Sequence, residues 1–486
     1  MNQPIRRLTA VVFLMFVMIM ASVTMVQFVR APELNADSRN ARIINREYTR
    51  ERGPIIAGDK RIVTSEDTGE RPYRYRRVYH EGPAYAHITG YFSRTAYAKT
   101  GLEKAEDSVL SGFDDSLALN QLKKTLTGQT PAGGGVELTI DPKLQHAAID
   151  ALDGQKGAIV ALEPASGKIL AMVSNPSFDP NVLVSPSREE LTEIFGSLEQ
   201  DPNKPLLNRA IGDELYVPGS VFKLITATAM LEAGDTPDTL IEAPTQYVPE
   251  GTSHPINNPA KRACGDGSGR VPLRAALAQS CNTPFAIAAI NLGQETMAEQ
   301  AEKFGFDADL KIPLSVRNSV FPETKSPAEL AMSGFGQFDV RVSPLQMAMV
   351  GAAIANDGEL MTPYLVDRTV TADLDIISTT KPSVLSEPMS AESAAELTDM
   401  MVGVVNNGTG HRAQLPNVQV AGKTGTAEIS DTIPPHAWFV GFAPADNPEI
   451  VVAVMVENGG KVGFGADGGS LAAPMASAII QTALAH

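Results

Sequence analysis

The sequence predicts an α+β protein in which an antiparallel sheet carries helices on both faces, behind a separate module and one membrane-spanning helix. Three observations support this fold class. Strand-like apolar runs lie near both ends of residues 136–486, helical patterns lie between them, and an uncharged apolar run fills residues 8–29. A sheet assembled from both ends of one domain, with helices packed on it, is the simplest arrangement of these segments.

Length and composition set the frame for this prediction. At 486 residues the chain is long enough for two or three domains, and 43% hydrophobic residues supply a full core. The net charge of −16 argues against a nucleic-acid binder, because phosphate contacts need a basic face. Cys264 and Cys281 are the only cysteines, so the sequence has no cysteine cluster with metal-ligand spacing and we expect no metal.

The chain opens with a membrane signal. Arg6 and Arg7 precede the run Leu8 to Val29, which is about long enough to cross a bilayer as a helix. Positive charge before the run predicts that residues 1–7 form a cytoplasmic tail and that the remainder lies outside the cell membrane. The alternative is a cleaved signal peptide, but the run is long for one and lacks an A-x-A site. We therefore expect a retained anchor over residues 8–29.

Residues 30–135 are predicted to form a separate module. They are rich in arginine and tyrosine, as in the run Arg71 to Arg77. That run could face anionic lipid or cell-wall polymer, although a solvated surface is the interpretation we favour. Pro131 to Gly135 is a flexible joint by composition, and we place the domain boundary there.

Secondary structure is easier to predict beyond this joint. Asp141 is a plausible N-cap for a helix over Pro142 to Leu152, with proline at the first helical position. The runs 157–162 and 168–173 flank a turn and predict a β-hairpin. The remaining predicted elements are strands at 418–421, 438–442 and 450–456 and a closing helix at 472–484.

A serine and a lysine one helical turn apart give the first chemical signal. Residues 216–223 read YVPGSVFK, and apolar residues at helical spacing follow until Gly234. Ser220 is therefore expected at or near a helix start, with Lys223 on the same face. A lysine can activate a serine hydroxyl if burial or neighbouring cations lower its pKa. The pair alone is weak evidence, because an exposed cation near a helix cap is the commoner explanation.

Two later motifs strengthen the catalytic interpretation of Ser220 and Lys223. Ser280-Cys281-Asn282 alone could be a turn, and Lys423-Thr424-Gly425-Thr426 alone could be a strand end with a surface lysine. The order Ser-x-x-Lys, Ser-x-Asn, Lys-Thr-Gly, however, is the signature of the penicillin-recognising serine acyl-enzymes. Together the three motifs point to acyl transfer.

The chain as a whole resembles the class B penicillin-binding proteins, the monofunctional D,D-transpeptidases of bacterial cell-wall synthesis. Its character is similar to the actinobacterial elongation-type members. The resemblance implies a penicillin-binding, β-lactamase-like transpeptidase domain over 136–486 and an elongated pedestal (dimerisation-like) domain over 30–135. Further passages that carry it are Arg52 to Ile56, Gly157 to Met172, Pro176 to Asn181, Asn208 to Ala210, Ser333 to Gln337, Pro344 to Ala348 and Ala437 to Phe442.

The resemblance also implies a role for each motif residue. Ser220 would attack the carbonyl of the penultimate D-alanine of a stem peptide and form an acyl-enzyme, with Lys223 as general base. Ser280 would relay a proton toward the leaving nitrogen, and Asn282 would hydrogen-bond the backbone amide of the substrate. Which of Lys223, Ser280 and Lys423 moves the proton at each step stays open.

The lysine-threonine motif would bind the end of the substrate. Lys423 would keep a positive potential in the site, and the hydroxyls of Thr424 and Thr426, with Gly425 between them, suit a terminal carboxylate. The backbone N–H groups of Ser220 and Thr426 would form the oxyanion hole. No cofactor is implied.

The partners that the resemblance implies are substrates, inhibitors and one membrane protein. The donor is a stem peptide ending in D-Ala-D-Ala, and the acceptor is an amine from a second strand. β-Lactams would acylate Ser220. A glycan polymerase of the SEDS family would be held through the membrane helix and the module before Gly135.

The two cysteines lie on the oxidising side of the membrane if the topology is right. We expect a disulfide between Cys264 and Cys281 that braces the loop between them; the alternative is a buried free thiol at Cys281.

Three other functions compete with transpeptidation. A β-lactamase needs a feature that activates a deacylating water, and the anchor and the long amino-terminal module argue against that role. A D,D-carboxypeptidase gives the acyl group to water, and the sequence leaves residual activity of this kind open. A membrane β-lactam sensor would carry an H-E-x-x-H zinc motif, which the sequence lacks.

Three further features have a structural explanation that we favour. Gly463 to Gly468 matches G-x-G-x-x-G but leaves too little chain for a dinucleotide fold, so a loop before the last helix is expected. Gly265 to Gly269 is expected to be a surface loop. His436 is expected to be structural, because the motifs supply a lysine base.

Overall fold

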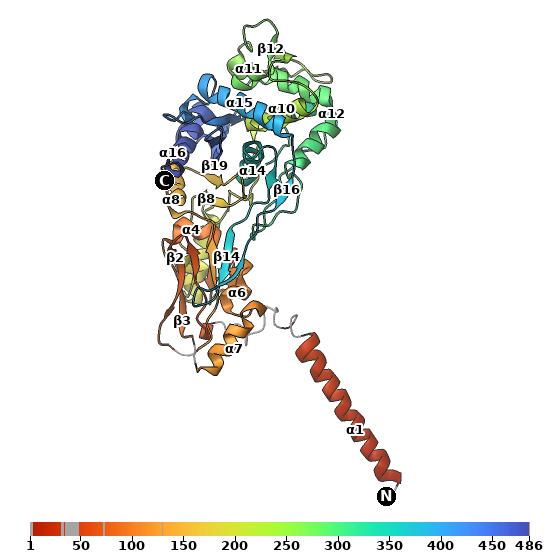
Figure 1. Cartoon of the computed structure of the whole chain (residues 1–486), viewed down its shortest axis with the longest axis vertical. Helices are drawn as coiled ribbons and strands as arrows, with labels where there is room; N and C mark the ends of the chain where they lie inside the picture. The colour runs from red at the N-terminus through yellow and green to blue at the C-terminus, as the bar shows by residue number, and fades with distance from the viewer. Residues whose placement is uncertain (1–2, 31–33, 35–47, 71–72, 129, 486) are drawn as a thin grey trace.

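The computed structural model describes residues 3–30, 34, 48–70, 73–128 and 130–485. Figure 1 shows helix α1 at one end, a pedestal in the middle and a larger domain at the other end. The larger domain contains all three sequence motifs.

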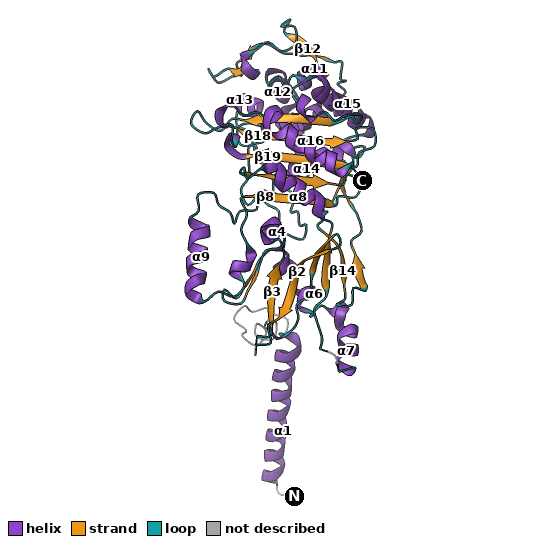
Figure 2. Ribbon diagram, turned by 90° about the vertical axis from the view of Figure 1, so that its left-hand side faces the viewer, coloured by secondary structure: helices purple, strands orange, loops and turns teal. Residues whose placement is uncertain are grey.

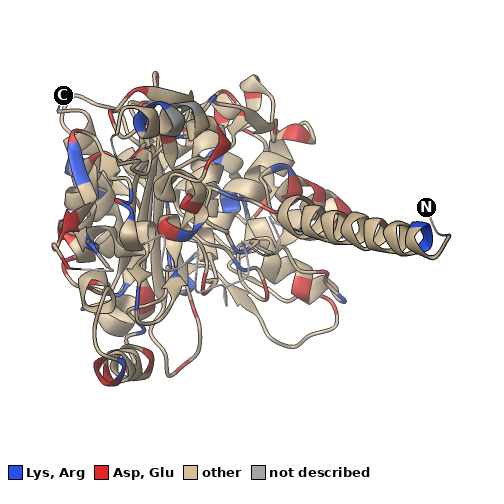
Figure 3. Ribbon diagram, turned by 90° about the horizontal axis from the view of Figure 1, so that it is seen from below, with Lys and Arg blue, Asp and Glu red and all other residues tan. Residues whose placement is uncertain are grey.

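The first helix is apolar and exposed. α1 spans Gln3–Thr24 and continues as the π-helical turn η1 (Met25–Val29), and none of its residues is buried. Seen from below, Lys and Arg colour only its N-terminal end (Figure 3). Among the described residues, Gln3–Val29 is the single helix long and apolar enough to span a bilayer. This agrees with a single-pass membrane protein.

The pedestal is built on a six-stranded sheet of order β15-β14-β6-β1-β2-β3. β1 pairs in parallel with β6 and antiparallel with β2, and β14 pairs antiparallel with β6. The strands are β1 (Ile55–Ala57), β2 (Lys60–Asp67), β3 (Tyr75–Tyr79), β6 (Gly135–Leu138), β14 (Val366–Val370) and β15 (Ile376–Thr379). The helices beside them are α4 (Gly82–Thr89), α5 (Gly101–Ala105), α6 (Asp107–Ser111) and α7 (Ala118–Leu126), and a short hairpin joins β4 (Phe92–Ser93) to β5 (Ala98–Lys99).

This sheet draws on distant parts of the chain. The boundary predicted at residue 135 falls at the first residue of β6, and β14 and β15 return to the pedestal sheet from within residues 136–486. The domain boundary at residue 135 therefore stays a prediction about how the sequence divides. In space, strands from both sides of it form one sheet.

The basic run of the pedestal is not a uniformly solvated surface, and that part of the prediction is wrong. Arg77 is 1% exposed and its Nε donates to Glu103 Oε1 at 2.6 Å. Arg52 donates to the other oxygen of the same carboxylate at 2.5 Å. Two buried guanidinium groups thus share one buried carboxylate, a pairing that sequence composition does not reveal. Residues 71 and 72 of the run lie outside the described residues.

The larger domain is built on a five-stranded antiparallel sheet. Its strands, in spatial order, are β17 (Ala421–Ala427), β18 (His436–Ala443), β19 (Ile450–Val456), β7 (Gly157–Leu162) and β8 (Ile169–Asn175). The hairpin β7-β8 and strands β18 and β19 are confirmed. The strand predicted at 418–421 is wrong in extent, because β17 begins at Ala421 and runs through the Lys-Thr-Gly motif.

Helices cover both faces of this sheet, as predicted (Figure 2). Along β19, Val452, Val454 and Val456 pack with α8 (Pro142–Leu152) and α16 (Ala473–Ala483). The alternate residues Val451, Ala453 and Met455 pack on the opposite face with α14 (Pro344–Ala355), and α10 (Lys223–Glu232) lies in the same core. This alternation follows from the period of two in a strand.

The remaining elements surround this core. Asp141 caps α8 through its side chain, as predicted, and the glycine-rich run 463–468 lies in short turns before α16. The other helices are α9 (Arg188–Gln200), α11 (Leu273–Ala278), α12 (Thr283–Lys303), α13 (Pro327–Ser333) and α15 (Ala391–Asn407), and the short strands are β9 (Leu240–Glu242), β10 (Gln246–Tyr247), β11 (Ile256–Asn257), β12 (Arg270–Pro272), β13 (Leu360–Met361) and β16 (Val384–Ser386).

Candidate active site

Ser220 lies in a 3₁₀ turn, η4 (Gly219–Phe222), that runs directly into α10. Gly219 has a φ of +56°, and its N–H donates to the Gly336 carbonyl at 2.8 Å. A Cβ at Gly219 would lie 2.5 Å from the carbonyl oxygen of Thr426, so a side chain there would push the turn away from β17. The predicted helix start is confirmed, and the turn brings the serine to the edge of the sheet.

Lys223 is fully buried behind Ser220. Its Nζ donates to the Ser280 carbonyl at 2.7 Å and to Asn282 Oδ1 at 2.8 Å. Burial, with the nearby charge of Lys423, holds the pKa of Lys223 well below its usual range. A neutral amine has two N–H groups and one lone pair. The two short bonds use both N–H groups, which leaves the lone pair to accept a proton.

The hydroxyl of Ser220 is not yet engaged by that amine. Within the described part of the chain, no hydrogen bond joins Lys223 Nζ to Ser220 Oγ; the third partner of Nζ is Ser280 Oγ, at 3.4 Å. Catalytic hydrogen bonds often tighten only when substrate is bound.

Ser280 lies between two lysines. Its Oγ accepts from Lys423 Nζ at 2.8 Å, in addition to the longer contact with Lys223. Lys423 is also fully buried, donates to the Thr424 carbonyl at 2.8 Å, and has its pKa lowered to about 7 by burial. A hydroxyl between two amines of lowered pKa is well placed to pass a proton.

The Lys-Thr-Gly motif lies on β17, the edge strand of the sheet. The Thr426 carbonyl faces Gly219, as the 2.5 Å approach above shows. The N–H and C=O of one residue point to the same side of an antiparallel strand. The Thr426 N–H therefore faces the Ser220 turn, where an oxyanion-hole donor is needed.

Gly425 allows this close approach from the side of the strand. A Cβ there would lie 3.0 Å from both the Pro218 carbonyl oxygen and Val221 Cγ1. The indole N–H of Trp438, on β18, donates to the Val217 carbonyl at 3.0 Å. The strand and the serine turn are thus held against each other.

The wall that carries Ser280 and Asn282 is braced by the predicted disulfide. Cys264 and Cys281 are bonded, with their Cα atoms 5.9 Å apart. Asn282 Nδ2 donates to the Asn257 carbonyl at 2.7 Å, which fixes the orientation of the amide.

One cavity of about 1160 Å³ joins these residues. Its volume suits a peptide better than a small metabolite. Lys223 and Lys423 lie beneath its surface. The predicted residues that line it are Ser220, Ser280, Asn282, Thr424 and Thr426.

Sequence reasoning missed several residues around the site. Thr409 Oγ1 lies 2.5 Å from Thr424 Oγ1. Behind the serine turn, Glu457 Oε1 accepts from Tyr216 Oη at 2.6 Å and from Arg209 Nε at 2.7 Å. Arg209 belongs to a passage that the family resemblance marked, but nothing in the sequence marks Glu457 or Thr409.

His436 is a structural residue, as expected. Its ring packs edge-on against Tyr216, its Nδ1 accepts from the Asn458 N–H at 3.1 Å, and burial lowers its pKa. No group of metal-ligating side chains occurs in the described ranges.

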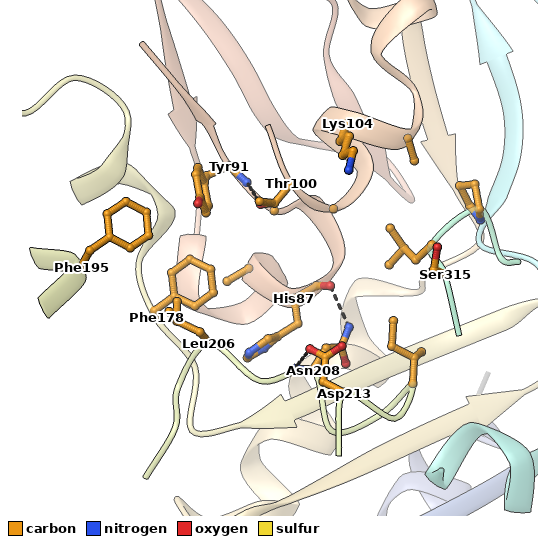
Figure 4. Close-up of a pocket in the computed structure, with 17 residues that line it drawn as sticks. His87, Tyr91, Thr100, Lys104, Phe178, Phe195, Leu206, Asn208, Asp213 and Ser315 are labelled. Carbon is orange, nitrogen blue, oxygen red and sulfur yellow. Dashed lines mark hydrogen bonds between the residues drawn. The ribbon is translucent and has the colours of Figure 1, made fainter. Parts of the chain in front are cut away.

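A second cavity, of about 600 Å³, lies between the pedestal and the larger domain (Figure 4). Asn208 Nδ2 donates to the His87 carbonyl across it at 3.0 Å, and the ring of Phe195 lies near Tyr91. None of the predicted site residues lines this cavity. The motif chemistry therefore belongs to the first cavity.

Known proteins match the chain over both domains. The family of the penicillin-binding protein transpeptidase domain matches residues 157–481, and the dimerisation domain of penicillin-binding protein A matches residues 52–136. Peptidoglycan D,D-transpeptidase PbpA of Mycolicibacterium smegmatis is 44% identical, with 100% of this chain and 99% of the relative covered. The Mycobacterium tuberculosis protein of that name is 42% identical, with the same shares covered.

Solved structures agree. A ceftriaxone acyl-enzyme complex of penicillin-binding protein A from M. tuberculosis superposes with a TM-score of 0.86 at 41% identity, covering 90% of this chain and 100% of that chain. A D,D-transpeptidase domain from Eggerthella lenta gives a TM-score of 0.76 at 33% identity, covering 90% and 98%. The matches extend through the pedestal and the sheet that carries the three motifs, and the chain belongs to the class B penicillin-binding proteins.

Proposed function

We infer that this chain is a peptidoglycan D,D-transpeptidase that cross-links stem peptides through a serine acyl-enzyme. The observation that carries the inference is the geometry around Ser220. The serine opens onto a peptide-sized cavity, and behind it lies Lys223, a buried amine whose pKa is held well below its usual range by burial and by Lys423. Relatives with this fold bear the name of that enzyme.

Acylation uses the residues in turn. Lys223 Nζ accepts the proton of the Ser220 hydroxyl as Oγ attacks the carbonyl carbon of the penultimate D-alanine. The N–H groups of Ser220 and Thr426 stabilise the oxyanion that forms. The C–N bond then breaks, and the leaving D-alanine nitrogen takes a proton through Ser280, which touches both lysines.

The remaining groups hold the donor in place. Protonated Lys423 and the hydroxyls of Thr424 and Thr426 attract its terminal carboxylate, and the Asn282 amide bonds its backbone. After D-alanine leaves, an acceptor amine attacks the ester carbonyl, loses a proton to the same relay, and releases Ser220.

β-Lactams follow the first half of this path. Their strained amide resembles the donor, so Ser220 Oγ opens the ring and remains acylated. Penicillin-binding protein A from M. tuberculosis has been solved as acyl-enzyme complexes with ceftriaxone, imipenem and penicillin G.

Fluorescent penicillin tests the nucleophile. We expect covalent labelling of the wild-type protein and loss of labelling in Ser220→Ala, detected after denaturing electrophoresis. The control is Ser197→Ala, which changes an exposed serine on α9 that does not line this cavity. Equal labelling of wild type and Ser220→Ala would refute the assignment.

A donor-acceptor assay tests the reaction itself. We expect purified protein to release D-alanine from a donor peptide and to form a new amide when an amine acceptor is present. Mass spectrometry separates that product from the hydrolysed peptide. Hydrolysis alone, at every acceptor concentration, would indicate a D,D-carboxypeptidase.

The membrane placement and partner belong to the same proposal. Residues 1–7 lie in the cytoplasm and the larger domain lies outside, because Arg6 and Arg7 precede the apolar helix. A SEDS-family glycan polymerase binds α1 and the pedestal. Cysteine accessibility on either side of the membrane tests the orientation, and co-purification of the polymerase with the full chain but not with a chain lacking residues 1–30 tests the contact.

A further inference from the structure

The wall with Ser280 and Asn282 is fastened by a residue outside the three motifs. Asn258 is buried, and its Oδ1 accepts hydrogen bonds from the Asn282 N–H at 2.8 Å and the Thr283 N–H at 3.0 Å. Its Nδ2 donates to the Pro244 carbonyl at 3.2 Å. A single amide therefore ties the beginning of α12 to the loop that faces it.

Ser280 is in a conformation that needs such support. Its φ is +56°, in the left-handed region that residues with a Cβ rarely adopt. Strained residues of this kind persist only where their surroundings over-determine them. On the chain, Ser280 is followed by Cys281, which the disulfide holds, and by Asn282, which Asn258 holds. The two fastenings act on consecutive residues.

The side-chain amide of Asn282 is hydrogen-bonded to the general base, Lys223. Asn282 Nδ2 donates to the Asn257 carbonyl, so its Oδ1 is turned toward Lys223 Nζ, which donates to it at 2.8 Å. If the Asn282 backbone moved, this acceptor and the Ser280 carbonyl would move together. Both short hydrogen bonds that orient the lone pair of Lys223 depend on this segment.

We propose that Asn258 is a positioning residue for acylation: it holds Ser280 and Asn282 where they orient Lys223 toward Ser220. It acts through Asn282 and takes no part in proton transfer. The inference rests on the proposed acyl-enzyme function.

The test compares acylation by fluorescent penicillin in the wild type and Asn258→Ala, with rates normalised to the folded fraction. We expect the rate constant of the covalent step to fall by about 10- to 100-fold, because small misplacements of catalytic groups have effects of this size. The affinity of the preceding non-covalent complex should change little. At acidic pH the rate should rise as Lys223 loses its proton. The pH at which this acid limb of the profile is half-maximal should also move in the variant, since the surroundings of Lys223 change. A merely structural role would lower thermal stability without moving that limb.

Three variants complete the experiment. Asn258→Asp keeps an oxygen for both N–H groups and should recover most of the rate. Gln246→Ala removes an exposed amide on β10 whose side-chain hydrogen bond, within the described residues, goes to the side chain of Asn257, and it should behave as wild type. If Asn258→Ala does not fold, Asn258→Ser replaces it, because a hydroxyl on the shorter side chain cannot reach both N–H groups.

The outcomes separate the two claims. A folded Asn258→Ala or Asn258→Ser with the wild-type rate and pH profile would overturn the positioning role alone. Failure of penicillin to label the wild type at Ser220 would instead overturn the proposed function.

Discussion

At the scale of single residues, the site depends on two buried lysines whose pKa values are lowered by different causes. Lys223 has its pKa held far below the usual range by burial and by the second lysine, whereas burial lowers the pKa of Lys423 to about 7. Two effects therefore lower the pKa of Lys223 and only one lowers that of Lys423, so we expect Lys223 to lose its proton first as the pH rises. Interacting groups titrate as a pair, so the apparent values belong to both.

This difference predicts a bell-shaped pH profile for acylation by penicillin. The rate should rise with pH as Lys223 loses its proton, and fall above about pH 7 as Lys423 loses the charge that attracts the ligand carboxylate. Stopped-flow fluorescence across pH 4 to 10 would measure both limbs.

A charge-preserving variant identifies the alkaline limb. In Lys423→Arg the guanidinium stays charged at every accessible pH, so the decline above neutrality should disappear even if the maximal rate is lower. An unchanged alkaline limb in that variant would assign it to another group.

The sequence predicted the motif residues well and their supports poorly. Ser220, Ser280 and Asn282 line one cavity, with Lys223 and Lys423 directly beneath it. Each of the five lies in a short pattern whose chemistry is recognisable before the fold is known. Asn258 and Glu457 have no such pattern. Each acts through contacts made by residues distant in the chain, such as the pair of Glu457 with Arg209, and only the folded chain reveals them.

At the scale of elements, β17 shows why one strand was misplaced. Lys, Thr and Gly in the centre of β17 have a low preference for strands. The strand was therefore predicted at the more apolar residues 418–421, just before the motif. In the structure all seven residues from Ala421 to Ala427 pair with β18. Gly425, which weakens the pattern, is what allows β17 to approach the serine turn.

The disulfide should stabilise the loop between β11 and α12. It closes a loop of 17 residues, for which the chain-entropy model gives about 3 kcal/mol. We expect the double variant Cys264→Ser, Cys281→Ser to melt roughly 6 °C lower by differential scanning fluorimetry.

Alkylation of the wild type without reductant should label no thiol; two labelled thiols would contradict the bridge. Reductant should not change the melting temperature of the double variant.

At the scale of the whole molecule, the pedestal sheet is shared between distant parts of the chain. β14 and β15 lie beyond residue 365, yet they extend the sheet that begins with β1, with β6 between them. The composition of residues 131–135 predicts a joint in the sequence, but composition cannot reveal that later strands return across it.

A fragment of residues 30–135 should therefore fail to fold. It lacks almost all of β6 and the whole of β14 and β15, so one edge of β1 would be left unpaired. We expect an unfolded amide spectrum by NMR for this fragment. A well-dispersed spectrum with cooperative melting would show that β1, β2, β3 and the helices suffice.

The shared sheet also fixes where the enzyme can work. The chain passes between pedestal and larger domain after β6, before β14 and after β15, whereas a single flexible tether would let the nucleophile sweep through many depths of the cell wall. Because α10 lies at the end of the molecule remote from α1 (Figure 1), these crossings set the distance between the serine and the pedestal sheet. We expect a fixed distance of this kind to confine new cross-links to a narrow range of depths in the cell wall.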